Sequence, residues 1–240
     1  MADSDATVDT RIDEVGDGIY RISTATAAIP GGFTFNQYLL VDDEPLLYHT
    51  GMRGLFPAVR RAIESVLPLA RLRWIAFAHV EADECGAFRE LLDAAPAARP
   101  LCGRTQAMLA IGDLTDRPAT VLADGAVHAT GRRRLLWMDA PHVPHGWDNA
   151  FAFETTTRTL FCGDLFTQGG AALAPVTESD VLGPSEALRA KLPYFALGPN
   201  TAAVLDRLAA TEPVLLACMH GSAWRGDGAA LLRALRDRLP

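Results

Sequence analysis

The chain has 240 residues, of which 49% are hydrophobic and 21% are charged, and its formal net charge is −7. This composition is typical of a folded protein with a substantial buried core. The acidic balance disfavours nucleic acid and anionic membrane surfaces as partners, and no apolar run approaches the length of a membrane span. Residues 1–5 are polar and acidic, unlike a secretory signal, so we expect a cytoplasmic protein.

The first half of the chain predicts strands and helices in alternation. The apolar run over 74–78 predicts a buried strand, and two strands on either side of the turn residues Asp42-Asp43-Glu44 predict a hairpin. In chain order, the predicted elements are strands over 18–23, 35–41 and 45–48, a helix over 54–67, a strand over 74–78, a helix over 87–95, a short strand at Leu101 and a short helix over 105–111.

The second half predicts a run of short strands and then helices. Two of the strands pair naturally as a hairpin across Thr156-Thr157-Arg158. The predicted elements are strands over 119–122, 126–128, 134–138, 151–155 and 159–162, helices over 185–192 and 201–210, a strand over 214–218 and a closing helix over 229–239. Strands and then helices, twice over, predict two sheets with helices on their outer faces. No change of composition divides the chain, so we expect one domain over 1–240.

A polar cluster directly follows the predicted strand over 74–78. It contains one imidazole and three carboxylates within six residues: His79, Glu81, Asp83 and Glu84. Burying three carboxylates together is costly unless cations neutralise them. Because loops at strand ends are where such sites form in α/β proteins, the sequence predicts a metal centre here.

Three further strand ends carry ligand-type side chains beside glycine. They are His145 in Pro-His-Val-Pro-His-Gly-Trp, Asp164 in Cys-Gly-Asp-Leu and His220 in Cys-Met-His-Gly-Ser. Glycine is expected where a loop brings its backbone close to an ion. One such residue would be weak evidence, whereas four sites in this order are strong evidence. His142 lies three residues before His145 and is the alternative ligand of that segment.

The order His-x-Glu-x-Asp, His, Gly-Asp and His-Gly-Ser resembles the metallo-β-lactamase superfamily over nearly the whole chain. The resemblance implies an α/β fold, classed as α+β in some schemes: a four-layered αββα sandwich with a two-metal site at the sheet edge. Most members carry His where this chain has Glu81. Glu81 resembles the flavodiiron proteins, and the segments His-Val-Glu-Ala-Asp-Glu-Cys-Gly, Pro-His-Gly-Trp and Gly-Asp-Leu-Phe are similar to those of the oxygen-binding di-iron proteins.

Carried over residue by residue, the resemblance implies two iron ions joined by an oxo or hydroxo bridge. The implied ligands are His79, Glu81 and His145 for one ion, Asp83 and His220 for the other, and Asp164 for both. Glu84 stands where many relatives have His, and it either ligates the second iron or is a loop carboxylate that accepts backbone N–H groups. Three His with at least three carboxylates form a hard, oxygen-rich set, which suits iron or manganese better than zinc. Zinc and manganese are the alternative metals.

Other residues are candidates to support or line the site. His142 is a ligand or a hydrogen-bond partner of one, and His49 stands at a strand end where superfamily members often place an Asp. The candidates to line the pocket are Phe33, Phe35, Tyr38 and Tyr194, and a Tyr hydroxyl there could hydrogen-bond a bound ligand.

Three functions follow, and the sequence leaves them open. The first is a non-haem di-iron protein that binds dioxygen or another small diatomic ligand, and that reduces O2 or NO if a separate partner supplies electrons. This chain has no Gly-rich phosphate loop, so we expect it to bind no flavin itself. The second is a binuclear-metal hydrolase of an ester, thioester, lactone or phosphodiester. The third is an oxygen sensor read by a signalling protein. For an enzyme, a di-iron oxidoreductase is favoured over a zinc hydrolase, and the resemblance suggests a homodimer.

Overall fold

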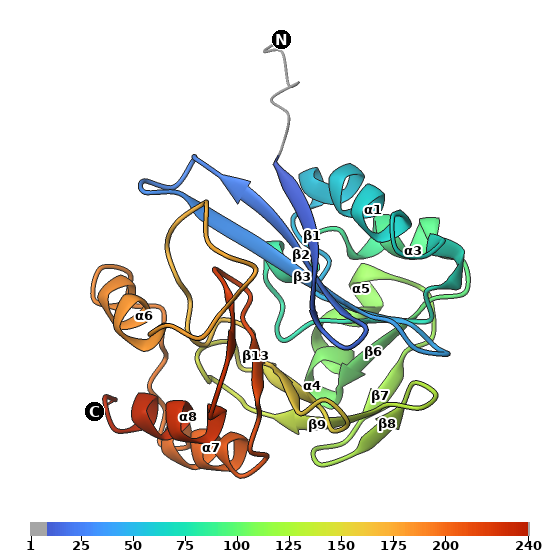
Figure 1. Ribbon diagram of the computed structural model, residues 1–240. Coiled ribbons are helices and arrows are strands. Elements are labelled where there is room, and N and C mark those ends of the chain that lie inside the picture. The colour runs from blue at the N-terminus through green and yellow to red at the C-terminus, as the bar shows by residue number, and fades with distance from the viewer. Residues whose placement is uncertain (1–8, 240) are drawn as a thin grey trace.

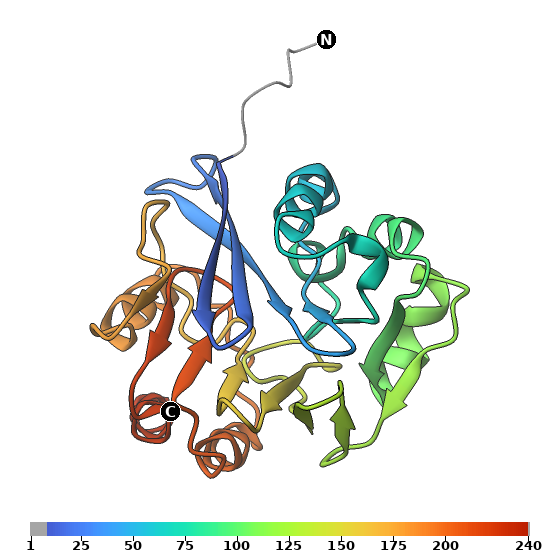
Figure 2. The same cartoon turned by 45° about the vertical axis from the view of Figure 1, so that its right-hand side comes forward.

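Two seven-stranded sheets face each other in the computed structural model, which describes residues 9–239. Helices cover the outer face of each sheet, so the layers run helix, sheet, sheet, helix (Figure 1). Figure 2 shows the two sheets between the helices of the N-terminal half and those of the C-terminal half. This is the four-layered architecture that the sequence predicts. The polar segment over 1–5 lies outside the described residues.

The first sheet has the strand order β1-β2-β3-β4-β5-β6-β7. Neighbours are antiparallel from β1 to β4 and parallel from β4 to β7. Its strands are β1 (Thr10–Gly16), β2 (Ile19–Thr26), β3 (Phe33–Leu40), β4 (Leu46–Tyr48), β5 (Trp74–Ala76), β6 (Arg99–Gly103) and β7 (Thr120–Leu122). The helical segments of this half are η1 (Arg53–Leu55), α1 (Phe56–Glu64), η2 (Leu69–Arg71), α2 (Ala82–Cys85), α3 (Phe88–Ala94), α4 (Arg104–Gln106), η3 (Ala107–Ile111) and α5 (Gly112–Leu114).

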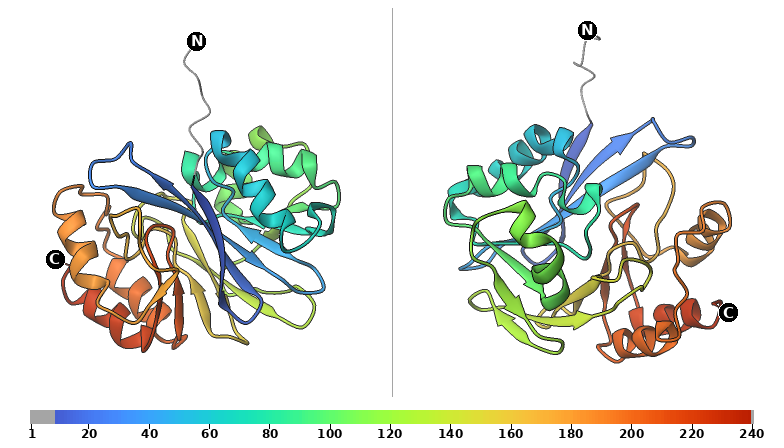
Figure 3. Two further views of the ribbon diagram at one scale, coloured as in Figure 1. Left: turned by 45° about the horizontal axis from the view of Figure 1, so that its top comes forward. Right: turned by 180° about the vertical axis from the view of Figure 1, so that it is seen from behind.

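The second sheet has the strand order β12-β14-β13-β11-β10-β9-β8. Its strands are β8 (Val127–Ala129), β9 (Arg134–Asp139), β10 (Ala150–Glu154), β11 (Thr159–Phe161), β12 (Val176–Thr177), β13 (Leu215–Ala217) and β14 (Ala223–Arg225). The helices of this half are α6 (Leu182–Arg189), α7 (Thr201–Ala209) and α8 (Gly228–Arg236). The two further views show α7 and α8 together on the side of this sheet that faces away from the first sheet (Figure 3).

Three apolar layers hold the sandwich together. One packs the first sheet against α1 and α3, and one packs the second sheet against α7 and α8. The third lies between the sheets and contains the fully buried Tyr38, Trp137 and Phe161. Aromatic side chains of this size contribute most to such cores because each removes a large apolar area from water. Residues of both sheets contribute to this layer. The single domain expected from the sequence stays a prediction.

Most predicted elements are confirmed to within a few residues, including both hairpins. The sequence did not predict β1, η2, α2, β12 and β14. β1 is an edge strand with half-exposed side chains, and α2, β12 and β14 have two to four residues each, too few to show a period. Within residues 9–239, no helix has the length and apolarity needed to cross a bilayer.

Candidate metal centre

Four strand ends bring the predicted ligands to one edge of the sandwich. His79 follows β5, Asp164 follows β11, His220 follows β13, and His145 lies between β9 and β10. Because β11 and β13 are parallel neighbours, their carboxyl ends meet at the same edge. The N–H of Ala150 in β10 donates to the carbonyl of Ala78 (2.9 Å), which holds the two sheets together beside the site.

The first group of side chains surrounds one oxygen of Glu81. Glu81 Oε2 lies 2.7 Å from His79 Nε2 and 3.1 Å from His145 Nε2. Asp164 Oδ2 lies 3.2 Å from His145 Nε2 and 3.8 Å from His79 Nε2. Each of these four residues offers a ligand atom within 4.8 Å of the others, so they could hold one metal ion.

The second group lies on the other side of Asp164. His220 Nε2 lies 3.1 Å from Asp164 Oδ1 and 3.4 Å from Asp83 Oδ2. Asp83 Oδ1 is buried and has no hydrogen-bond partner among the described residues. Leaving a buried carboxylate oxygen unpaired is costly, so a cation is the natural partner for it. The two oxygens of Asp164 therefore face two separate sets of ligand-type atoms.

The imidazole of His220 is oriented as metal-binding imidazoles usually are. His220 Nδ1 is 2.8 Å from the carbonyl oxygen of Thr34, and Phe33 packs on the His220 ring at 4.4 Å between centroids. A hydrogen bond from Nδ1–H leaves Nε2 free to face the carboxylates. Gly146, at a φ of +74°, brings the loop before β10 against His79, where a Cβ would come within 3.1 Å of that side chain.

Electrostatics at the site show crowded negative charge. Burial raises the pKa of Asp83 to about 6, with Asp164 and Glu84 adding to the rise, although His220 opposes it. Hydrogen bonds with His145 and His79 lower the pKa of Glu81. Burial opposes the charged form of His79, but Glu84 and Glu81 outweigh it and raise its pKa to about 12. Two divalent cations would balance the formal charge of the four carboxylates, so the donor set fits a two-metal centre.

The remaining candidates lie in different surroundings. Glu84 and His49 are fully buried behind His79, with Glu84 Oε1 3.4 Å from His49 Nε2. His142 is exposed, and the structure gives no contact between its side chain and the ligand group. Tyr38 does not line the cavity at the metal edge, because its ring is in the layer between the sheets and its hydroxyl donates to the Cys218 carbonyl at 2.7 Å.

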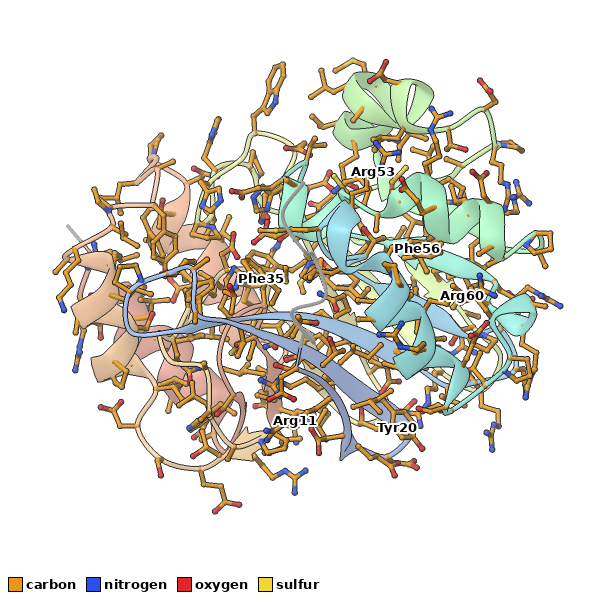
Figure 4. All side chains as sticks on the ribbon, turned by 90° about the horizontal axis from the view of Figure 1, so that it is seen from above. Arg11, Tyr20, Phe35, Arg53, Phe56 and Arg60 are labelled. Carbon is orange, nitrogen blue, oxygen red and sulfur yellow. The ribbon has the colours of Figure 1, made fainter. Side chains whose placement is uncertain are left out.

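A cavity of about 360 Å³ opens in front of the ligands. Tyr194 and Phe35 line it, and Phe35 lies where the N-terminal strands (blue) come close to the C-terminal half of the chain (orange) (Figure 4). The sequence analysis missed the other apolar lining residues: Ile29, Pro30, Met52, Leu188 and Leu192. They come from loops and a helix far apart in the sequence, and only the fold brings them together. No Lys or Arg is among the described residues that line this cavity.

The fold and the order of these side chains are those of the metallo-β-lactamase sandwich. A family model described as "ODP family beta lactamase" matches residues 33–188, which is more than half of the chain. The chain belongs to this family.

Two curated proteins are similar to the chain in sequence, and a solved structure is similar to it in fold. The chain is 25% identical to a nitric oxide reductase of Moorella thermoacetica over 212 residues, covering 85% of this chain and 52% of that protein. It is 24% identical to a rubredoxin-oxygen oxidoreductase of Megalodesulfovibrio gigas, with 82% and 50% covered. The flavodiiron protein of Giardia intestinalis superimposes with a TM-score of 0.81 at 18% identity, covering 95% of this chain and 59% of that one. The chain thus spans about half the length of the curated relatives it matches.

Proposed function

We propose that the protein is a non-haem di-iron protein that binds dioxygen, and that reduces O2 or NO when a separate partner supplies electrons. His79, Glu81 and His145 would hold one iron, Asp83 and His220 would hold the other, and Asp164 would offer one oxygen to each. The two related enzymes named above act on nitric oxide and oxygen according to their names, which supports this class of ligand.

The observation that carries the proposal is the position of Asp164. Its Oδ2 is 3.2 Å from His145 Nε2, while its Oδ1 is 3.1 Å from His220 Nε2. One carboxylate that faces two sets of ligand atoms is suited to bridging two ions. Glu81 adds an oxygen where a zinc enzyme would more often use nitrogen, and this favours iron or manganese over zinc.

Iron supplies the binding and reduction of the small diatomic ligand when it is bound at these residues. The chain contributes the surroundings. Phe33, Phe35 and Leu192 make an apolar wall, which limits the access of water to the ligands. Burial raises the pKa of the Tyr194 hydroxyl to about 12, so Tyr194 stays protonated and can donate a hydrogen bond into the cavity.

The lining of the cavity favours this function over hydrolysis. Many substrates of binuclear hydrolases carry a phosphate or carboxylate, and recognising these groups calls for Arg or Lys. The described lining residues are apolar, apart from the ligand group and the polar Thr167 and Tyr194. A small neutral ligand needs no cationic side chain. Electrons would then come from a separate redox protein, and the homodimer is a proposal that rests on the family resemblance.

An oxygen-binding experiment tests the proposal. The protein is loaded with ferrous iron without air, and its visible spectrum is recorded before oxygen, after oxygen and after an argon purge. We expect a new band with oxygen that the Asp164→Ala variant lacks. Fading of the band on purging would favour transport or sensing, whereas its decay on addition of a chemical reductant would favour reduction. No spectral change in a protein that holds two irons would contradict the proposal, and ester or lactone hydrolysis by the zinc-loaded protein would favour the hydrolase.

A further inference from the structure

Behind His79 lie two buried side chains that the proposed ligand set leaves out, Glu84 and His49. Glu84 is 0% exposed, and its Oε2 accepts the backbone N–H of His79 at 2.7 Å. Its Oε1 lies 3.2 Å from His79 Nδ1 and 3.4 Å from Nε2 of His49, which is also 0% exposed. These three buried atoms are next to one another, and none has another hydrogen-bond partner among the described residues. A carboxylate placed this deep needs partners, and the two imidazoles and the backbone N–H are those at hand.

Glu84 contacts the wrong side of the imidazole to be a metal ligand. Its oxygen is next to Nδ1 of His79, whereas Glu81 and Asp164 are next to Nε2. The ring of His79 therefore separates Glu84 from the atoms that could hold an ion. Unlike Asp83 and His220, the ligands proposed for the second ion, Glu84 does not line the cavity.

We propose that Glu84 is a positioning residue for His79 and that His49 holds Glu84 in place. Glu84 accepts the Nδ1–H of His79, which fixes the ring orientation and leaves Nε2 to the metal ion. Such carboxylate–histidine–metal arrangements make the imidazole a stronger donor to the metal. The inference rests on the metal centre proposed above, but not on iron or oxygen chemistry.

Backbone hydrogen bonds hold Glu84 and His49 to the segment that follows β4 and to β5. The carbonyl of Glu84 accepts the N–H of Thr50 at 2.6 Å and its hydroxyl at 3.1 Å, and the N–H of His49 donates to Ala76 in β5 at 2.8 Å. His49 has a φ of +66°, a left-handed conformation that residues other than glycine seldom adopt. The His49 ring packs against Tyr48 at 4.5 Å between centroids, and its Nε2 lies next to Glu84. A strained residue in this position is consistent with a role in holding Glu84.

His220 provides a comparison inside the same site. Its Nδ1 is paired with a neutral carbonyl, that of Thr34, at 2.8 Å. The nearest side-chain oxygen to Nδ1 of His79 is instead a carboxylate oxygen, Oε1 of Glu84, at 3.2 Å. Removing the charge of Glu84 should therefore lower the affinity for the ion held by His79. The affinity for the ion held by His220 should change much less.

The test uses zinc, because it needs neither oxygen nor reductant and gives sharp NMR signals. Glu84→Gln keeps the shape of the side chain and removes its charge, and Glu154→Gln is the matched control, a buried glutamate far from the ligands. We expect both proteins to bind two zinc ions. We expect Glu84→Gln to bind the more strongly affected ion ~10–100-fold more weakly than the wild type, and Glu154→Gln to bind as the wild type does. In the ¹H–¹⁵N spectrum of the zinc-loaded wild type, the ring N–H of His79 should appear far downfield, and it should move upfield in Glu84→Gln.

Three outcomes would overturn the inference. Zinc content that falls from two ions to one in Glu84→Gln would make Glu84 a ligand. Unchanged affinity and an unchanged His79 signal, with lower thermal stability only, would make Glu84 a packing residue. A wild type that binds no zinc, manganese or iron would show that there is no metal centre for Glu84 to support.

A wild type that binds two zinc ions as expected but never responds to oxygen would contradict the proposed function and leave this inference standing. If Glu84→Gln does not fold, His49→Gln tests the same chain of contacts and should shift the His79 signal in the same direction by a smaller amount.

Discussion

The two ends of β10 show two ways of burying carboxylates. At one end, Glu154 is 0% exposed and accepts the N–H groups of Thr156 at 2.8 Å and Thr157 at 2.7 Å, the hydroxyl of Thr157, and Arg133 Nη1 at 3.4 Å. Burial would raise the pKa of Glu154, but the hydrogen bonds of Thr157 and Thr156 outweigh it and lower the pKa. The protein itself supplies every partner of this charge.

At the other end, next to Ala150, carboxylates face imidazoles and one another. Asp83 Oδ1 accepts no hydrogen bond from the described residues, and burial and the acidic neighbours raise the pKa of Asp83 to about 6. The contrast teaches that the residue type alone does not distinguish a structural carboxylate from a ligand. What distinguishes them is whether the surrounding chain provides the donors or leaves them to a cation.

The largest effect is expected from Asp164→Ala, because Asp164 is the residue that both groups of ligand atoms share. We expect the affinity for each of two ions to fall by ~1000-fold or more, which corresponds to about 4 kcal/mol per ion. Calorimetric titration with zinc and iron analysis of the purified variant measure this loss. Retention of one tightly bound ion would mean that Asp164 belongs to one site only.

Glu154→Gln should lower the free energy of unfolding by about 2 kcal/mol, with or without metal, because Arg133 loses its buried counter-charge. The folded-state pKa of Glu154 lies below the unfolded value, so this stabilisation is fully present above pH of about 4.3 and is lost as the pH falls through the folded-state pKa. Urea unfolding at a series of pH values compares the variant with the wild type. A difference that persists at the lowest pH would contradict the charge-based account.

Glu81→His should change which metal the centre prefers. Replacing an oxygen ligand by nitrogen makes the set softer, so we expect preference to shift towards zinc over iron by ~10-fold or more. Competition between zinc and ferrous iron under argon, read as metal content after gel filtration, measures the ratio. The same ratio in variant and wild type would show that Glu81 does not determine the metal.

The smallest effect is expected from Asp83→Asn, and its sign is the informative part. Without metal, the amide removes a charge that its acidic neighbours disfavour, so the variant should be more stable than the wild type by about 1 kcal/mol at neutral pH. With saturating zinc, the order should reverse, because the wild type gains more binding energy. Thermal unfolding with zinc and with a chelator gives both comparisons. A variant that is less stable than the wild type in both conditions would show that Asp83 is a structural carboxylate, as Glu154 is.

Much of this could be predicted from the sequence because the ligand groups follow apolar strands in segments that each carry a local signal. The apolar run over 74–78 predicts a buried strand, and the next polar residue, His79, lies just after that strand ends. The cavity was harder to predict. Tyr38 and Phe35 belong to the same strand, yet the first is in the core between the sheets and the second lines the cavity, and strand period alone cannot say which. The role of Glu84 depends on which nitrogen of His79 it reaches, and spacing in the sequence carries no such information.

Anomalous X-ray diffraction at the iron edge, from crystals of the iron-loaded protein, tests the central claim most directly. The account predicts two peaks on opposite sides of the Asp164 carboxylate, one contacted by His79, Glu81 and His145 and the other by Asp83 and His220, with Glu84 in contact with neither. A single peak, or two peaks that Asp164 does not join, would contradict it.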